Sequence, residues 1–248
     1  MPDVEDLTDD RQWAAARARD MLVAGGTTPP RPRLIGVMVA SVDARAALDG
    51  KSGGLSSEPD KALLKAWRAV ADAVLVGART LETERYGSLI PDADRDARLA
   101  AGRPGWPRLL TISRRLDIDF AKTLSTDPDL PLTVYTEADA TDGDRAHGSD
   151  VEIVTLPDVA PANVVADARD RYGAQVIACE GGPHLLAAAL RAGVLTDLSI
   201  TVAPAIGGEG PPLIPDSGRA APIALELRDA EARAGSIFAH YTVTPGAS

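Results

Sequence analysis

The sequence is poor in metal-binding, disulfide-forming and aromatic residues: among 248 residues it has one cysteine and three histidines, and aromatic residues make up 4%. A single cysteine, Cys179, excludes a disulfide framework within the chain. The histidines His147, His184 and His240 lie far apart in the sequence, and one cysteine adds little to them, so we expect no metal site. These absences leave a chain whose fold has to depend on packing alone.

Long apolar runs are also absent. No segment approaches the roughly 20 apolar residues that span a bilayer. The first ten residues are acidic and lack the apolar core of a signal peptide. We therefore expect a soluble, cytoplasmic protein with no membrane partner.

The sequence has fewer basic residues than acidic ones. Lysine and arginine total 26 against 36 aspartates and glutamates, which gives a formal net charge of −10, and the basic residues form no cluster. A nucleic-acid-binding surface needs the opposite balance, so we expect no nucleic-acid partner. Hydrophobic residues make up 45% and charged residues 25%, an ordinary globular composition.

Two parts of the chain differ in pattern. Residues 1–30 are expected to form an appendage, with an amphipathic helix over residues 9–24 followed by a linker rich in glycine and proline. This helix is expected to pack on the main domain or on a second subunit. Residues 31–248 are expected to form one domain.

Strand and helix patterns alternate through residues 31–248, and the end of the chain is rich in strands. We expect strands over 34–40, 73–76, 109–112, 132–135, 151–154, 175–179, 195–202, 223–230 and 236–243, and helices over 57–70, 160–171 and 183–192. The segment 86–106 is expected to be the longest irregular loop. The pattern predicts a three-layer α/β/α domain with a mixed sheet.

The strongest local motif is Glu180-Gly181-Gly182-Pro183, where a buried strand meets a glycine turn and a helix begins. Glycines allow close approach of the backbone to a ligand, and a helix amino terminus attracts anions such as a diphosphate. A plain strand-to-helix turn fits the motif equally well. The motif is neither a Rossmann glycine pattern nor a phosphate-binding loop with a lysine.

Two further strands end in polar residues. Asp43 follows the first strand, and Thr80 follows the strand that ends at Gly77. Each loop alone is equally consistent with a surface turn or an ordinary helix start. Because strand ends of one sheet converge, Asp43, Thr80 and Glu180 are expected to face one cleft.

Several motifs in order and spacing carry a family resemblance: Ser41-Val42-Asp43-Ala44, Val76-Gly77-Ala78-Arg79-Thr80, Glu180-Gly181-Gly182-Pro183, Ala203-Pro204 and Gly207-Gly208. Together they resemble the stand-alone reductase domain of riboflavin biosynthesis, over roughly residues 33–243. That domain belongs to the dihydrofolate-reductase-like superfamily, so the resemblance implies a mixed, mainly parallel central sheet. The zinc deaminase domain of bifunctional relatives has no counterpart in this sequence.

The resemblance implies NADPH as the cofactor and a ribosylaminopyrimidine 5′-phosphate as the substrate, which is reduced to its ribityl form. It also implies a homodimer. The implied substrate-binding residues are Ser52, Arg68 and Glu180, and the candidate catalytic residues are Glu180 and Asp43. The implied cofactor-binding residues are Val39, Gly77, Thr80, Glu84, Ser113, Gly181, Gly182, Pro183, His184, Leu185 and Leu186.

The sequence departs from the family pattern at several positions. Val37 stands where bifunctional bacterial relatives carry a lysine, and Ala44 replaces a common glycine. An arginine that helps to hold the substrate phosphate is missing after Glu84, and Arg95 or Arg98 is a possible substitute. Two alternatives therefore stay open: reduction of another heterocycle, such as a pterin or dihydrofolate, and a nucleotide-binding module without turnover.

Overall fold

The computed structural model describes residues 4–24, 32–48, 50–84, 86, 88–119, 130–139, 151–215 and 222–244. The strands are β1 (Arg33–Ser41), β2 (Ala73–Gly77), β3 (Arg108–Ile112), β4 (Leu132–Thr136), β5 (Val151–Thr155), β6 (Val176–Gly181), β7 (Asp197–Ala203), β8 (Leu225–Arg233) and β9 (Ser236–Val243). The helices are α1 (Val4–Ala24), α2 (Glu58–Val70), α3 (Ala78–Glu84), α4 (Asp92–Ala100), α6 (Pro161–Tyr172) and α7 (Pro183–Arg191), with a short 3₁₀ helix, η1, at Ser52–Gly54.

One nine-stranded sheet forms the centre of the molecule, in the order β5-β4-β3-β2-β6-β1-β7-β9-β8. The strands from β5 to β7 pair in parallel, and β9 pairs antiparallel with both β7 and β8. Parallel strands covered on both faces have continuous apolar sequences, as in the buried run from Ala73 to Val76 of β2. The prediction of a mixed, mainly parallel sheet is confirmed.

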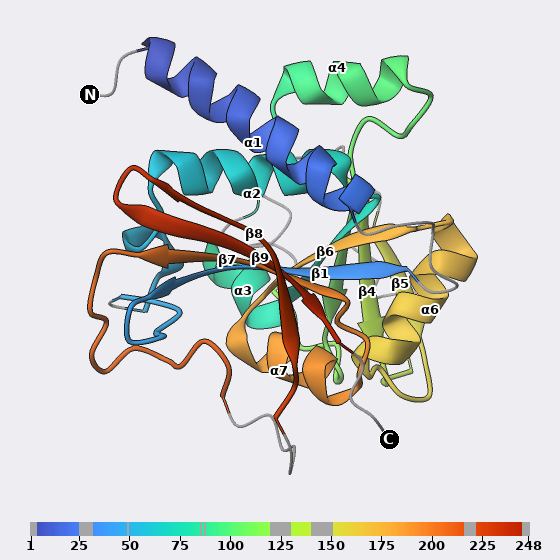
Figure 1. Cartoon of the computed structure of the whole chain (residues 1–248). Coiled ribbons are helices and arrows are strands. Elements are labelled where there is room, and N and C mark those ends of the chain that lie inside the picture. Colours follow the sequence, from blue (N-terminus) through green and yellow to red (C-terminus); the bar gives the residue numbers. More distant parts are fainter. Residues whose placement is uncertain are drawn as a thin grey trace.

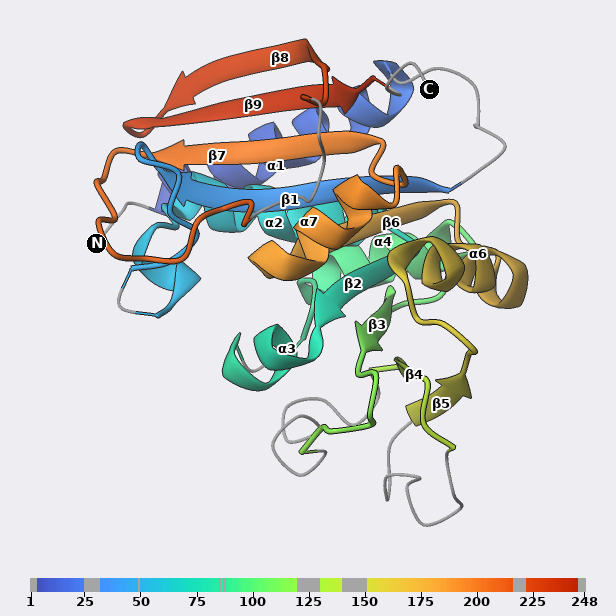
Figure 2. The same cartoon turned by 90° about the horizontal axis from the view of Figure 1, so that it is seen from below.

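Helices cover both faces of this sheet. Figure 1 shows α1, α2 and α4 on one side and α6 and α7 on the other, and Figure 2, seen from below, brings α7 in front of the strands. The predicted three-layer α/β/α arrangement is therefore confirmed. In the described part of the chain, no helix has both the length and the apolar character needed to cross a membrane.

The helix α2 begins where the sequence predicts it. The Ser57 side chain accepts a hydrogen bond from the Asp60 backbone N–H at 3.4 Å, and Pro59 lies in the first turn, where its missing N–H costs nothing. Leu63 and Trp67 are buried on the face that packs on the sheet. This packing fixes the rotation of α2, and with it the direction in which its other side chains project.

The helix α1 packs on this chain's own body, which is one of the two positions expected for it. The Trp13 ring meets Phe238 of β9 edge-on, with centroids 4.9 Å apart, and Arg17 Nη2 donates to Phe238 O at 3.1 Å. Ala14 and Ala18 are completely buried in the same cluster. The helix begins at Val4 rather than near residue 9, and the predicted linker at 25–30 lies outside the described residues.

The prediction of an irregular segment over residues 86–106 is wrong, because α4 forms within it. Glycine and proline stand only at the two ends of the segment, and Pro91 caps the helix without interrupting it. Arg98 is 4% exposed and donates to Ala69 O, Ala71 O and Pro104 O at 2.6–2.9 Å. Those long-range bonds dock α4 at the carboxyl end of α2.

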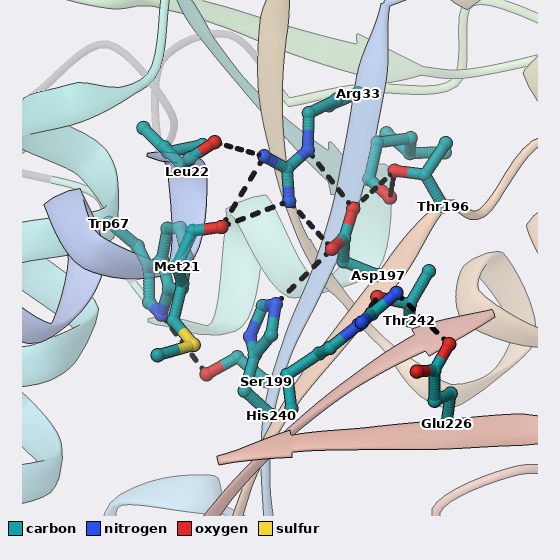
Figure 3. Close-up of polar contacts among 12 residues, drawn as sticks. Met21, Leu22, Arg33, Trp67, Thr196, Asp197, Ser199, Glu226, His240 and Thr242 are labelled. Atoms are coloured by element: carbon teal, nitrogen blue, oxygen red, sulfur yellow. Dashed lines mark hydrogen bonds and ion pairs between the residues drawn. The ribbon is translucent and has the colours of Figure 1, made fainter. Parts of the chain in front are cut away.

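A buried polar network joins α1 to the sheet, and Figure 3 shows Asp197 between Arg33 and His240. Arg33 Nη2 donates to Asp197 Oδ1 at 2.7 Å, and Arg33 Nη1 donates to Leu22 O of α1 at 2.8 Å. His240 Nε2 lies 3.2 Å from Asp197 Oδ1. The Trp67 ring of α2 stacks on His240 with centroids 5.6 Å apart, so five elements, α1, α2, β1, β7 and β9, meet at this network.

Candidate functional site

A cavity of about 950 Å³ opens at the carboxyl ends of β1, β2 and β6, with α2 and α7 along its sides. Ligands of open α/β sheets bind at this edge, outside the strand ends. The cavity gathers most of the residues predicted for ligand binding: Val39, Ser52, Arg68, Gly77, Thr80, Glu180, Gly182, Pro183, His184 and Leu185.

Glu180, near the end of β6, forms a bidentate ion pair with Arg68 of α2. Arg68 Nε donates to Glu180 Oε1 at 2.6 Å, and Arg68 Nη2 donates to Oε2 at 2.7 Å. The two side chains are 14% and 5% exposed, respectively. Two parallel charged hydrogen bonds fix the plane of the carboxylate, so Glu180 has a defined orientation beside the cavity.

Tyr86 completes this cluster. Its hydroxyl donates to Glu180 Oε2 at 2.9 Å, and its ring lies 5.1 Å from the Arg68 guanidinium carbon, a cation–π distance. Burial lowers the pKa of Arg68, but the neighbouring Glu180 carboxylate raises it more, and the pKa ends above its usual value. Arg68 therefore stays cationic, and its guanidinium retains further N–H groups for a ligand.

The turn between β6 and α7 is built around Gly182 and Thr80. The Gly182 N–H donates to Thr80 Oγ1 at 3.2 Å, and a Cβ added at Gly182 would lie 3.1 Å from that oxygen. Gly181 has φ of +79°, and a Cβ there would lie 3.1 Å from Met38 Sδ. Side chains would fill this cradle, so the glycines keep the backbone open for a close approach of a ligand.

The first turn of α7 supplies the anion-attracting end of a nine-residue helix. The amides of Leu185 and Leu186 donate to Gly182 O at 3.0 and 3.2 Å, which closes the turn. Pro183 occupies the first helical position, and His184 follows it on the cavity.

Some predicted cofactor residues lie away from the cavity lining. The Leu186 side chain is fully buried in the main core, and Gly181 and Ser113 are buried beside the site. Ile112, next to Ser113, does line the cavity. The side chain of Glu84 lies outside the described part of the structure, which gives only its backbone at the end of α3.

Asp43 joins two loops through the hydrogen bonds of its carboxylate. Its Oδ1 accepts from the Ser41 hydroxyl at 2.6 Å and from Gly207 N–H at 2.7 Å, and Oδ2 accepts from Gly208 N–H at 3.0 Å. These hydrogen bonds, the one from Ser41 first, lower the pKa of Asp43 to about 2. The residue is not among those that line the described cavity, and it ties the loop after β1 to the loop after β7.

The two arginines considered as substitutes for the missing phosphate-binding arginine have other partners. Arg98 donates to main-chain carbonyls, and Arg95 stacks on Trp106 with its guanidinium carbon 4.8 Å from the ring centroid. Neither is among the lining residues of the described cavity. Arg79, which follows β2, lines the cavity instead and is exposed.

Asp60 and Tyr86 are among the lining residues that the sequence did not predict. Asp60, Leu64 and Arg68 are spaced by four residues on α2, and this spacing places them along one side of a helix. Because Arg68 was predicted to bind the substrate, its spacing from Asp60 could have identified Asp60 as a second residue on the cavity. Tyr86 gave no such signal, because only the tertiary structure brings it to Glu180.

The match to a known protein family begins after α1. Residues 32–237 match the family described as the RibD C-terminal domain. The riboflavin biosynthesis protein RibD of Mycobacterium tuberculosis is 30% identical over 190 residues, which cover 75% of this chain and 46% of that protein. This chain thus spans about half the length of the relatives that it matches.

Solved structures share the fold. A pyrimidine reductase-like protein from Corynebacterium diphtheriae superposes with a TM-score of 0.72 and 29% identity, over 86% of this chain and 92% of that one. RibD from Acinetobacter baumannii gives a TM-score of 0.70 at 18% identity, over 86% of this chain and 58% of that one. Because the family match covers most of its residues, the chain belongs to the RibD C-terminal domain family.

Proposed function

We propose that this protein is an NADPH-dependent reductase that converts a ribosylaminopyrimidine 5′-phosphate to its ribityl form. The observation that carries the proposal is one cavity bordered by both a glycine cradle and an Arg68–Glu180 pair. The names of the relatives, a riboflavin biosynthesis protein and a pyrimidine reductase-like protein, support the same chemistry.

The glycine cradle is assigned to the cofactor. Gly182, Thr80 and the start of α7 would hold the diphosphate, and Val39 and Gly77 line the adjoining part of the cavity. NADPH supplies a hydride when it is bound, so the protein has to hold the cofactor and the substrate in a fixed relative position. The Thr80–Gly182 hydrogen bond serves that task, since it fixes the turn before any ligand arrives.

The other part of the cavity is assigned to the substrate. Arg68 presents a permanent cation suited to a phosphate, and Ser52 in η1 adds a hydroxyl to the lining. Glu180 is held by Arg68 and Tyr86, so it meets the substrate with a fixed carboxylate. An oriented carboxylate next to the reacting carbon can hold a donor group of the base or guide a proton to nitrogen.

The direct test is the loss of nicotinamide absorbance with the ribosylaminopyrimidine phosphate as oxidant. We expect turnover with NADPH and none without the pyrimidine substrate. Binding of NADPH with no turnover of this substrate would show that the pathway assignment is wrong. It would favour reduction of another heterocycle or a nucleotide-binding role.

A variant at Arg68 tests the phosphate assignment. Arg68→Ala should reduce kcat/KM for the phosphorylated substrate by about 100-fold or more, because a charged hydrogen bond in a buried site is lost. It should reduce kcat/KM much less for the same compound without its phosphate. Equal losses for both compounds would assign Arg68 to the support of Glu180 alone.

A homodimer, implied by the family resemblance, is part of the proposal. Leu225, Leu227 and Ile237 on the β8–β9 hairpin are 43%, 53% and 52% exposed, which is high for large apolar side chains on one element pair. Light scattering should give twice the chain mass, and Leu227→Lys should reduce it. A monomeric wild-type protein at micromolar concentration would exclude this part of the proposal.

A further inference from the structure

Asp60 is a buried carboxyl group on the cavity for which the predicted ligand contacts have no use. It is 8% exposed and lies on the first turn of α2, with Leu64 and Arg68 following at intervals of four residues along the same cavity wall. The Ser56 and Thr201 hydroxyls are its side-chain hydrogen-bond partners, and burial raises its pKa above the usual value. Among the described residues, no arginine or lysine forms a close ion pair with it.

Placing a carboxylate there has a cost, because removal of a charge from water disfavours folding. The hydroxyls offset part of that cost and leave acceptor capacity, since a carboxylate has about four lone-pair sites and two hydroxyls occupy about two. An acidic residue in the first turn of a helix does interact favourably with the helix dipole. Glu58, exposed on the same turn, already supplies that effect without burial, so the dipole does not explain why Asp60 faces the cavity.

The position of Asp60 on α2 indicates which part of a ligand it contacts. Eight residues at about 1.5 Å each separate Asp60 from Arg68 by about 12 Å along the helix axis. This wall of the cavity therefore carries the Asp60 carboxyl group at one end and, at the other, the Arg68 guanidinium, which is paired with Glu180. A phosphorylated nucleoside-like substrate has the complementary polarity, with an anionic phosphate at one end and a base rich in N–H donors at the other.

We infer that Asp60 is a substrate-binding residue whose carboxylate accepts hydrogen bonds from N–H donors on the heterocyclic base. This inference rests on the proposed function for the identity of the base. Ser56 and Thr201 act as positioning residues, because their hydroxyls hold the Asp60 carboxylate in place. A donor-poor heterocycle is expected to bind poorly here, because it would leave the buried Asp60 carboxylate without further hydrogen bonds.

Asp60→Asn tests the inference, and Glu58→Gln is the matched control on the same helical turn, where Glu58 pairs with Lys61 in solvent. Asp60→Asn should raise the KM for the ribosylaminopyrimidine phosphate by about 10- to 100-fold, the loss expected for a charged hydrogen bond. The KM for NADPH should stay within about twofold, and the control should match wild type in both. An unchanged substrate KM in Asp60→Asn would overturn the inference.

A binding measurement separates this inference from the proposed reaction. The probe is 5,6-diaminouracil, a base with neither ribose nor phosphate, titrated calorimetrically into protein saturated with NADP⁺. Weaker binding by Asp60→Asn than by Glu58→Gln supports the inference even if wild type turns over no substrate, in which case the proposed reaction alone fails. Equal binding by the two variants overturns the inference.

Should Asp60→Asn fail to fold, Asp60→Glu keeps the charge and moves it by one methylene. We expect it to bind the base fragment about tenfold more weakly than wild type, because the hydrogen-bond geometry is lost while the charge remains. Wild-type affinity in Asp60→Glu overturns the inference as well.

Discussion

Glu180 shows how a single residue acquires its role from distant parts of the chain. The ion pair with Arg68 spans 112 residues of sequence and the Tyr86 hydrogen bond spans 94. Removing one partner of a buried pair leaves the other charge without compensation, which is more damaging than the pair is stabilising. Substitutions in this cluster therefore need a stability measurement beside each activity measurement.

Thr80→Val is the sharpest test of the cofactor cradle at this scale. The change keeps the shape of the side chain but leaves the Gly182 N–H without its acceptor, and the turn loses its fixed geometry. We expect the Kd for NADPH, measured by fluorescence titration, to rise about tenfold. Thr155→Val, at an exposed hydroxyl bonded to Ala138 O, is the control and should match wild type.

Asp43→Asn distinguishes a structural from a catalytic aspartate. The amide replaces a carboxylate that accepts three hydrogen bonds at the junction of two loops, so the thermal midpoint should fall. Turnover measured well below that midpoint should stay within about threefold of wild type. A loss of turnover beyond 100-fold at an unchanged midpoint would make Asp43 a catalytic residue.

At the scale of elements, α2 connects the core to the site. Trp67 faces the core, with its Nε1 donating to Ser199 Oγ of β7 at 3.0 Å, while Arg68 points to the cavity. Neighbouring residues on a helix project about 100° apart, so one rigid element serves both environments. The packing of Trp67 thereby sets the position of the Arg68–Glu180 pair.

The buried Arg98 contributes to the docking of α4 onto α2. Arg98→Met should reduce the free energy of unfolding by about 2–4 kcal/mol, because three carbonyl oxygens lose a charged donor. Urea denaturation measures this loss. Asp96→Asn, at an exposed position of the same helix, is the control and should change the free energy by less than about 0.5 kcal/mol.

At the scale of the whole molecule, net charge and local charge point in different directions. The chain carries −10, yet two phosphorylated ligands are proposed for its cavity. Net charge acts over distances that salt screens, whereas Arg68, Arg79 and the α7 terminus act at contact distance. A negative chain can therefore still select anionic ligands.

The Arg33–Asp197–His240 network makes the stability of the whole molecule depend on pH. Burial raises the pKa of Asp197, but hydrogen bonds from His240, Arg33 and Thr196 lower it to about 2. The lowered pKa of Asp197 stabilises the folded state by about 2 kcal/mol. This stabilisation is complete above the pKa of the group in the unfolded chain, about 4, and is lost as pH falls through about 2. Acid should therefore unfold the protein partly through this group.

Asp197→Asn checks this account. The variant should have a lower free energy of unfolding than wild type at pH 7, and the difference should shrink as the pH falls from about 4 to about 2. Urea titrations at pH 7, 4 and 3 measure the difference. A difference that is constant with pH would remove Asp197 from the acid dependence.

The sequence by itself determined the layered α/β fold, the order of the strands along the chain and ten of the residues that line the cavity. These features follow from local causes: apolar runs that require burial on both faces, a capping serine at α2, and glycines where the backbone turns. The side of α2 on which Asp60 lies also follows from the sequence, through the spacing between Asp60 and Arg68.

Only the tertiary structure decided which of those residues act together. The glycine- and proline-bounded segment before Trp106 folds as α4 because Arg98 finds carbonyls on α2, and the position of α1 depends on Phe238 of the last strand. Tyr86 reaches Glu180 of β6 from a loop, and Asp43 joins two loops, and no periodicity in the sequence encodes either contact. Pairing across a hundred residues depends on packing, and packing is settled only when the whole sheet and its helices close around one core.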